Sequence, residues 1–188
     1  MPPITLHFVR HGETPDNAIR RVQMPDAPLS DNGRAQAAAV AETLAATVQA
    51  GALLASDYAR TMETATIISG ALGLPITPEP ALRERHFGIA RGRMYDELDS
   101  EQMAIWRTPF ERIPEGESWA DVFERVGALI DRLRTDPPAD EMVLVTHGGA
   151  MSVALALLDG TPVADFVMAP LENCAVRTVT LEAMPAPR

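Results

Sequence analysis

An arginine and a histidine stand side by side where an apolar run ends, and a glycine follows them. The run ITLHFV leads into Arg10, His11 and Gly12, and a second run, EMVLVT, leads into His147 and two glycines. A neutral imidazole is a competent nucleophile near neutral pH, and a guanidinium binds anionic oxygens through its rigid fork. These residue types therefore predict nucleophilic chemistry on an anionic ligand.

The spacing of the histidines does not favour a metal site. His7 and His11 are four residues apart, and on a strand that spacing separates them by roughly 13 Å. His86 and His147 have no cysteine or carboxylate nearby at the spacing of metal ligands. We therefore expect neither a metal ion nor another cofactor.

Strands and helices that alternate along the chain are expected to position these residues. The hydrophobic pattern predicts strands at 4–10, 52–56, 74–80, 141–149 (ending in its glycine pair) and 174–182, and helices at 33–51, 58–73, 119–134 and 150–160. Ser56 or Asp57 is expected to cap the second helix, and Ser118 the third. The fold class is thus α/β, a single-domain three-layer sandwich with a largely parallel central sheet flanked by helices.

Parallel strands bring their carboxyl ends to one edge of the sheet, where ligands bind. His11 and His147 are both expected at that edge, with Gly12 allowing a tight turn and close approach of a ligand. For Arg10 and His11 to face one ligand, the strand must end near Val9, because neighbouring strand residues point to opposite faces. The helix after His147 begins near Gly148, and its free N–H groups are expected to face the anion.

We expect one domain over residues 1–188. The irregular segment 82–117 reads as a lid-like insertion over the site, and 183–188 as a flexible tail. The large apolar residues of the insertion are expected to form its own core, with an apolar approach to the site as the alternative; they are Phe87, Met94, Tyr95, Trp106 and Phe110.

The formal net charge is −10, so a nucleic-acid or anionic-membrane partner is not expected, since both need a basic face. No stretch approaches the roughly 18 apolar residues that span a bilayer, and the N-terminus lacks the pattern of a signal peptide. A single cysteine, Cys174, fits a reducing compartment, so we expect a cytoplasmic protein. The oligomeric state is left open, with a homodimer as one option.

Several motifs, in order, resemble the histidine phosphatase superfamily, which includes the cofactor-dependent phosphoglycerate mutases. They are RHGET, NAIRRVQMPDAPLSDNGRAQA, SDYARTMETA, LRERHFG, PEGES and VTHGG. The resemblance runs from residue 5 to about residue 176 and implies a phosphoglycerate mutase-like fold.

The resemblance also implies roles for individual residues. His11 matches the nucleophile that becomes phosphorylated, and Arg10 and Arg60 match the arginines that grip the phosphoryl group. His147 matches the second histidine of that pocket, which would add a positive donor if protonated. Glu84 matches the proton donor of the phosphatase and mutase branches. Such cations suit phosphoryl transfer, in which charge spreads over three equatorial oxygens.

Residues at the rim are implied as well, and substrate binding is expected from Arg10, Asn17, Gln23, Arg60 and Gly148. Arg20 or Arg21 could equally be solvated. Met24 departs from the family pattern, in which a glycine commonly follows the glutamine, and it is expected to narrow the pocket mouth. Asp16 replaces the usual tryptophan.

We therefore expect a phosphomonoester hydrolase that acts on a small-molecule phosphate ester through a phosphohistidine at His11, with Glu84 as general acid and base. Two alternatives remain. The segment LRERHFGIARG resembles the mutase version, although the chain is shorter than those mutases and contains no lysine. A phosphate-recognition module without turnover is the other alternative.

Overall fold

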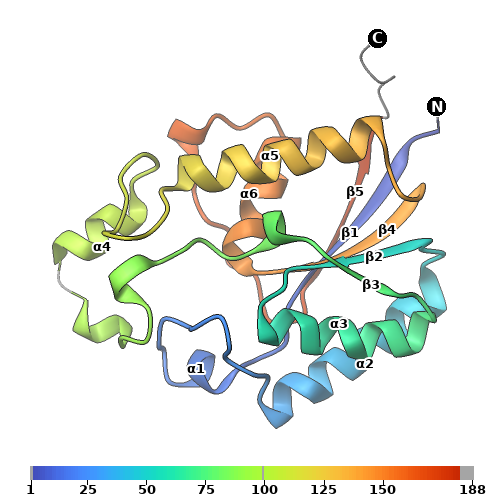
Figure 1. The fold of residues 1–188 in the computed structure, drawn as a ribbon, viewed down its shortest axis with the longest axis horizontal. Helices are drawn as coiled ribbons and strands as arrows, with labels where there is room; N and C mark the ends of the chain where they lie inside the picture. The colour runs from blue at the N-terminus through green and yellow to red at the C-terminus, as the bar shows by residue number, and fades with distance from the viewer. Residues whose placement is uncertain (1, 99, 183–188) are drawn as a thin grey trace.

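A five-stranded sheet forms the centre of the protein in this computed structural model, which describes residues 2–98 and 100–182 (Figure 1). The strand order is β3-β2-β4-β1-β5, and only β5 runs antiparallel to its neighbour. The strands are β1 (Ile4–Arg10), β2 (Ala52–Ala55), β3 (Ile76–Pro78), β4 (Glu141–Thr146) and β5 (Val176–Leu181). The predicted α/β class with a largely parallel sheet is confirmed.

Two pairs of helices cover the sheet, one pair on each face (Figure 1). The helices α2 (Asp31–Thr47) and α3 (Ala59–Leu72) pack together on one face, and α5 (Trp119–Thr135) and α6 (Gly148–Leu158) on the other. Both faces of the sheet are apolar, because successive residues of β4 point to opposite sides. Val143 packs with the α2 and α3 side, whereas Leu144 packs with the α5 and α6 side. The three predicted layers follow from this burial on both faces.

The helix ends agree with the predictions in part. Ser118 accepts a bond from the backbone N–H of Asp121 in a capping box, as expected for the start of α5. The prediction for α3 was wrong, because the N-cap is Tyr58, without a side-chain bond, rather than Ser56 or Asp57. Both side chains have other partners: the Ser56 hydroxyl binds His147, and Asp57 pairs with Arg83.

Other boundaries shift by a few residues. The helix predicted at 33–51 begins at Asp31, after the cap Ser30, and ends at Thr47, where Val48 turns extended. The helix predicted from 150 begins at Gly148. The segment 183–188, expected as a tail, lies outside the described residues.

The insertion contains short helical turns rather than one irregular loop. They are η2 (Gly88–Ala90), η3 (Tyr95–Glu97) and α4 (Ser100–Arg107), preceded by η1 (Pro80–Leu82). A further one-turn helix, α1 (Pro15–Ala18), lies in the predicted loop after β1, and η4 (Val163–Asp165) follows α6.

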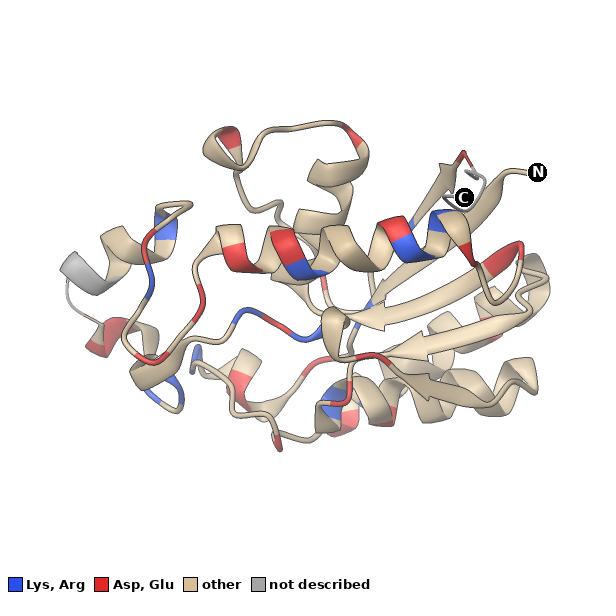
Figure 2. Ribbon diagram, turned by 45° about the horizontal axis from the view of Figure 1, so that its top comes forward, with Lys and Arg blue, Asp and Glu red and all other residues tan. Residues whose placement is uncertain are grey.

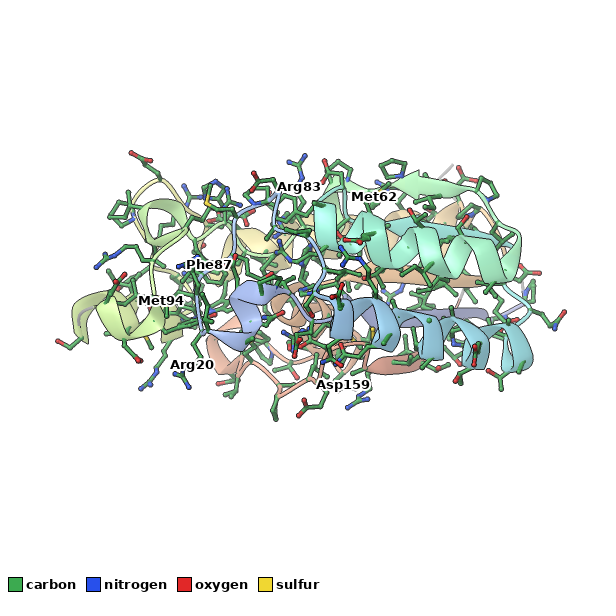
Figure 3. All side chains as sticks on the ribbon, turned by 90° about the horizontal axis from the view of Figure 1, so that it is seen from below. Arg20, Met62, Arg83, Phe87, Met94 and Asp159 are labelled. Carbon is green, nitrogen blue, oxygen red and sulfur yellow. The ribbon has the colours of Figure 1, made fainter. Side chains whose placement is uncertain are left out.

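The insertion is joined to the loop after α1 beyond the carboxyl ends of the strands (Figure 1). The backbone N–H of Tyr95 donates to the carbonyl of Arg20 at 2.9 Å, and Arg21 forms an isolated antiparallel bridge with Met94. Figure 3 shows Arg20 and Met94 at the same end of the molecule. This end of the molecule holds the candidate site. Movement of the insertion as a lid stays a prediction.

Charge is distributed according to these layers. The strands are largely free of charged residues, which gather on the helices and on the segments beyond the strand ends (Figure 2). No helix in the described part of the chain is long and apolar enough to cross a membrane.

Candidate active site

The two histidine segments meet because β1 and β4 are parallel neighbours in the sheet. Arg10 pairs with Thr146 in the register, so His11 and His147 each follow a paired residue. The backbone N–H of His11 continues the pairing by donating to the Thr146 carbonyl at 2.9 Å. The two rings lie edge to face with centroids 5.1 Å apart, so they meet as expected, although only His11 lines the cavity.

Arg10 and His11 line one cavity of about 220 Å³ together with Arg60 and Glu84. The strand ends at Arg10, as the apolar pattern predicted, and an earlier end near Val9 is not needed for both side chains to face one space. The chain therefore changes direction after the arginine, and both side chains still reach the same space.

The reason for Gly12 differs from the expected one. Its φ angle is not among the positive values found in this structure, so the turn does not require glycine. A Cβ on Gly12 would instead lie 2.4 Å from the backbone carbonyl oxygen of Gly33. Glycine is needed because the loop after β1 passes directly against the first turn of α2.

The hydrogen bonds of His11 indicate which ring nitrogen carries no proton. Nδ1 lies 2.7 Å from the carbonyl oxygen of Gly12, and Nε of Arg60 donates to Nε2 at 3.2 Å. Both contacts are satisfied if the proton is assigned to Nδ1, which leaves the lone pair on Nε2. Burial, followed by the charges of Arg60 and Arg10, lowers the pKa of His11 well below its ordinary value. The ring is therefore neutral at neutral pH.

Arg60 enters the site from the first turn of α3 and is only 2% exposed. Its Nη1 donates to the carbonyl of Met24 at 3.0 Å. Burial lowers the pKa of Arg60 to about 10, so the guanidinium stays charged at neutral pH. The Met24 side chain is 44% exposed and does not line the cavity, so the expectation that it narrows the mouth was wrong. Its backbone carbonyl orients Arg60 instead.

His147 occupies the N-cap of α6 and lies fully buried behind the cavity wall. Its Nε2 is 2.9 Å from the Ser56 hydroxyl, and its ring packs edge-on against Tyr58 as well as His11. Burial and then the charge of Arg60 lower the pKa of His147 well below its ordinary value. The ring is therefore neutral here, and the expected gain from a protonated His147 does not apply to this state.

Three buried polar atoms around the site have no hydrogen-bond partner among the described residues. They are Nε of Arg10, Oε1 of Gln23 and Nδ1 of His147. A buried polar atom without a partner costs about 1–3 kcal/mol, so proteins keep few of them. The Nη1 of Arg10 is already bonded to the carbonyl of Leu171, which fixes the guanidinium at the cavity. An anion beside Arg10 would provide the acceptor that its Nε lacks.

Glu84 is held at the N-terminus of α6, in the wall of the same cavity. Oε2 accepts a bond from the backbone N–H of Gly149 at 3.0 Å, and Oε1 accepts one from the N–H of Arg85 at 2.9 Å. The free N–H groups of this helix were expected to face a ligand. The structure corrects that expectation for Gly149, whose N–H orients the carboxylate, whereas Gly148 lines the cavity as expected.

The expected rim residues Asn17 and Gln23 both line the cavity. Oδ1 of Asn17 accepts the N–H of Thr14 at 3.1 Å in the capping box of α1, so its amide nitrogen remains for a ligand. Arg20 is exposed with its guanidinium 5.9 Å from the Tyr95 ring centroid, and Arg21 pairs with Asp16 on the surface. These two arginines therefore fit the solvated alternative.

Tyr58, Arg85 and Arg91 also line the cavity, and the sequence analysis did not assign them to it. Arg91 donates to the hydroxyl of Tyr58 at 2.7 Å and contacts Nε2 of His86 at 2.6 Å. The position of Tyr58, two residues before Arg60, could have indicated that it lies at the site. Arg91 lies in the insertion, where no regular pattern in the sequence indicates which residues face the cavity. Within the described ranges, no three His, Cys, Asp or Glu side chains form a group that could hold a metal ion.

An α/β fold with two neighbouring histidines at the carboxyl ends of parallel strands is the arrangement expected from the resemblance found in the sequence, and comparison with known families supports it. The profile of the histidine phosphatase superfamily (branch 1) matches residues 6–184. The chain belongs to this superfamily, which confirms the resemblance found in the sequence.

Relatives include both mutases and phosphatases by name. The chain is 35% identical over 189 residues to the "Probable phosphoglycerate mutase GpmB" of Cronobacter sakazakii, covering 97% of this chain and 87% of that protein. A mycobacterial glucosyl-3-phosphoglycerate phosphatase is structurally similar, with a TM-score of 0.84, 29% identity and coverage of 95% of this chain and 91% of the other. Bacillus stearothermophilus YhfR has a TM-score of 0.83 with 31% identity, covering 93% and 90%.

Proposed function

We propose that the protein hydrolyses phosphomonoesters through a phosphohistidine formed on Nε2 of His11. One observation carries the proposal: a buried, neutral imidazole has Nδ1 bonded to the Gly12 carbonyl and Nε2 directed at a charged arginine in a cavity. When a bound phosphoryl group takes over the Arg60 N–H, the Nε2 lone pair is free to attack phosphorus beside the same cation.

The first step transfers the phosphoryl group to the protein. Nε2 of His11 forms a bond to phosphorus while the bond from phosphorus to the ester oxygen breaks. Arg10 and Arg60 bind the equatorial oxygens, whose charge they stabilise through preorganised donors. Glu84 gives its proton to the departing alcohol oxygen, acting as general acid. The buried side chain of His147 supports the His11 ring.

The second step releases phosphate. Glu84, now a carboxylate, takes a proton from a water molecule as the water oxygen attacks phosphorus. The bond from phosphorus to Nε2 breaks, and the imidazole returns to its neutral form. The bonds from Gly149 and Arg85 to Glu84 would keep the carboxylate in place between its two roles.

Mutase activity is a second candidate, favoured by the name of the Cronobacter relative. It requires the phosphoryl group to return to the same bound molecule before water reaches it. Conversion of 3-phosphoglycerate to 2-phosphoglycerate, compared with phosphate release from the same ester, would separate the two activities. Faster conversion than release would overturn the hydrolase proposal in favour of the mutase.

The decisive experiment is rapid quenching with a phosphomonoester labelled on phosphorus. We expect a burst of acid-labile, base-stable phosphoprotein that decays to free phosphate and is absent in His11→Ala. His7→Gln is the matched control, because His7 is also buried but binds Thr178 and Glu141 away from the cavity. A stoichiometric complex without a covalent product would indicate the phosphate-recognition module instead.

A further inference from the structure

The cavity extends past the phosphoryl-binding residues along a wall of aromatic rings. Phe87 and Trp106 stack with centroids 3.9 Å apart and planes 17° from parallel, and Tyr95 lies 5.5 Å from Trp106. All three line the same cavity as His11. They also pack on the small core of the insertion, so they fulfil both of the roles considered for them in the sequence. Figure 3 shows Phe87 at the end of the molecule beyond α2 and α3.

Hydrogen bonds to the backbone carbonyl of Trp106 help to hold this wall in place. The carbonyl of Trp106 accepts bonds from Nε1 of Trp119 and from Nη1 of Arg85, both at 2.9 Å. Arg85 is 1% exposed, and its other nitrogens bind the carbonyls of Glu117 and Glu111. The guanidinium of Arg85 is thus committed to the architecture of the insertion, and the rings border the cavity as fixed apolar surface.

A second wall comes from the chain after η4, and it continues into an apolar groove. Met168 and Leu171 line the cavity, and Met168 also lines an adjoining groove of about 490 Å³. Trp106 also lines both spaces, so the groove adjoins the active-site cavity along these two side chains. Its lining residues are Met103, Trp106, Arg107, Trp119, Phe166, Val167 and Met168.

The groove presents apolar side chains to solvent beside a cationic pocket. Val167 is 84% exposed and Met168 is 50% exposed. Among the lining residues that the structure describes, Arg107 is the only charged one, and the indole N–H of Trp119 already has a partner. A polyhydroxylated alcohol would find few hydrogen-bond partners there, whereas an apolar group would remove exposed carbon surface from water.

From the adjoining cavity and apolar groove we propose that the site takes phosphomonoesters whose alcohol is an extended apolar group, alkyl or aryl. The phosphoryl group lies against Arg10 and Arg60, and the alcohol passes between the aromatic wall and Met168 into the groove. This inference rests on the proposed hydrolysis for its turnover assay, but it makes a separate statement about what the leaving group contacts.

The test is a series of ethyl, butyl, hexyl and octyl phosphates, whose alcohols have nearly equal acidity and differ mainly in apolar surface. We expect kcat/KM to rise by about threefold per added methylene until the groove is filled, mostly through KM. Glycerol 1-phosphate, which is polar and similar in size to butyl phosphate, should be turned over less efficiently. Phenylalkyl phosphates then distinguish aromatic from alkyl alcohols.

Two substitutions and a control assign any preference to the groove. Met168→Ser and Trp106→Ala should each reduce the ratio of kcat/KM for octyl phosphate to kcat/KM for ethyl phosphate by about tenfold. Phe110→Ala should leave that ratio unchanged, because Phe110 is an aromatic residue of the same insertion that is 61% exposed and lines neither space. Met168 lies in an exposed loop, so its variant tests the groove even where Trp106→Ala fails to fold.

The outcomes separate this inference from the proposed function. Equal kcat/KM for ethyl and octyl phosphate, with both hydrolysed, overturns the apolar subsite and leaves the hydrolase intact. If no ester is hydrolysed, the hydrolase proposal fails, and calorimetric affinities of ethyl- and octylphosphonate decide the subsite. Tighter binding of octylphosphonate that is lost in Met168→Ser supports the subsite, and equal affinities refute it.

Discussion

Replacing Gly149 by alanine would displace the carboxylate of Glu84 without removing it. A Cβ at this position would lie 2.3 Å from Oε1 of Glu84 and 2.9 Å from Cη2 of Trp119. Trp119 is packed in the core, whereas the carboxylate is the end of a flexible side chain. The carboxylate should therefore yield, and an ordinary contact distance requires a retreat of about 1 Å.

Such a retreat has a calculable effect on the proposed mechanism. A misplacement of about 1 Å can cost about 10²-fold in rate, and a general acid contributes about 10²–10⁴-fold in total. We expect kcat/KM for an alkyl phosphate to fall about 10²-fold in Gly149→Ala. The loss for p-nitrophenyl phosphate should be less than about tenfold, because nitrophenolate departs with little need of a proton.

The assay compares the two esters in matched variants. Glu84→Gln should reproduce the selective loss on the alkyl ester. Gly148→Ala should change both esters alike, because its Cβ meets Nε of Arg10 at an ordinary 3.5 Å and does not approach Glu84. Thermal unfolding monitors the fold, because the new Cβ also approaches Cη2 of the buried Trp119 to 2.9 Å. Equal losses on both esters in a folded Gly149→Ala would refute the assignment of Glu84 as the acid.

Two further predictions concern stability. The pKa values of His11 and His147 are depressed by burial and neighbouring arginines, so below about pH 6.5 the unfolded chain binds protons that the folded chain does not. The free energy of unfolding should be full above that pH and should decline below it by up to about 1.4 kcal/mol per pH unit for each histidine. Urea denaturation at a series of pH values should show a shallower decline for His11→Asn. An unchanged dependence of stability on pH in that variant would contradict a depressed pKa at His11. Gly12→Ala should destabilise the fold by about 1–3 kcal/mol, because its Cβ meets a backbone carbonyl, whereas Gly70→Ala, with nothing within 4 Å in α3, should stabilise it by about 0.5–1 kcal/mol. Effects of the same sign in these two variants would contradict the packing argument.

The sequence predicted those features of the protein that depend on near neighbours along the chain. Apolar runs place both ends of β1 and the start of β4, although β4 ends at Thr146 instead of at its glycine pair; Ser118 with Asp121 marks the start of α5. The six motifs that occur in family order, taken together, were sufficient to identify the superfamily. Local patterns suffice for these features because backbone hydrogen bonding and side-chain burial repeat over a few residues.

Tertiary structure alone decided which distant groups meet. Ser56 resembles a helix cap in the sequence, yet its hydroxyl binds His147 because β2 and β4 are neighbours in the sheet. Glu84 accepts the N–H of Gly149, a residue 65 positions away. Gly12 lies against the backbone of Gly33 rather than forming a special turn. Such contacts follow from strand order and helix packing, which no local pattern encodes, and together they orient the groups proposed to carry out the reaction.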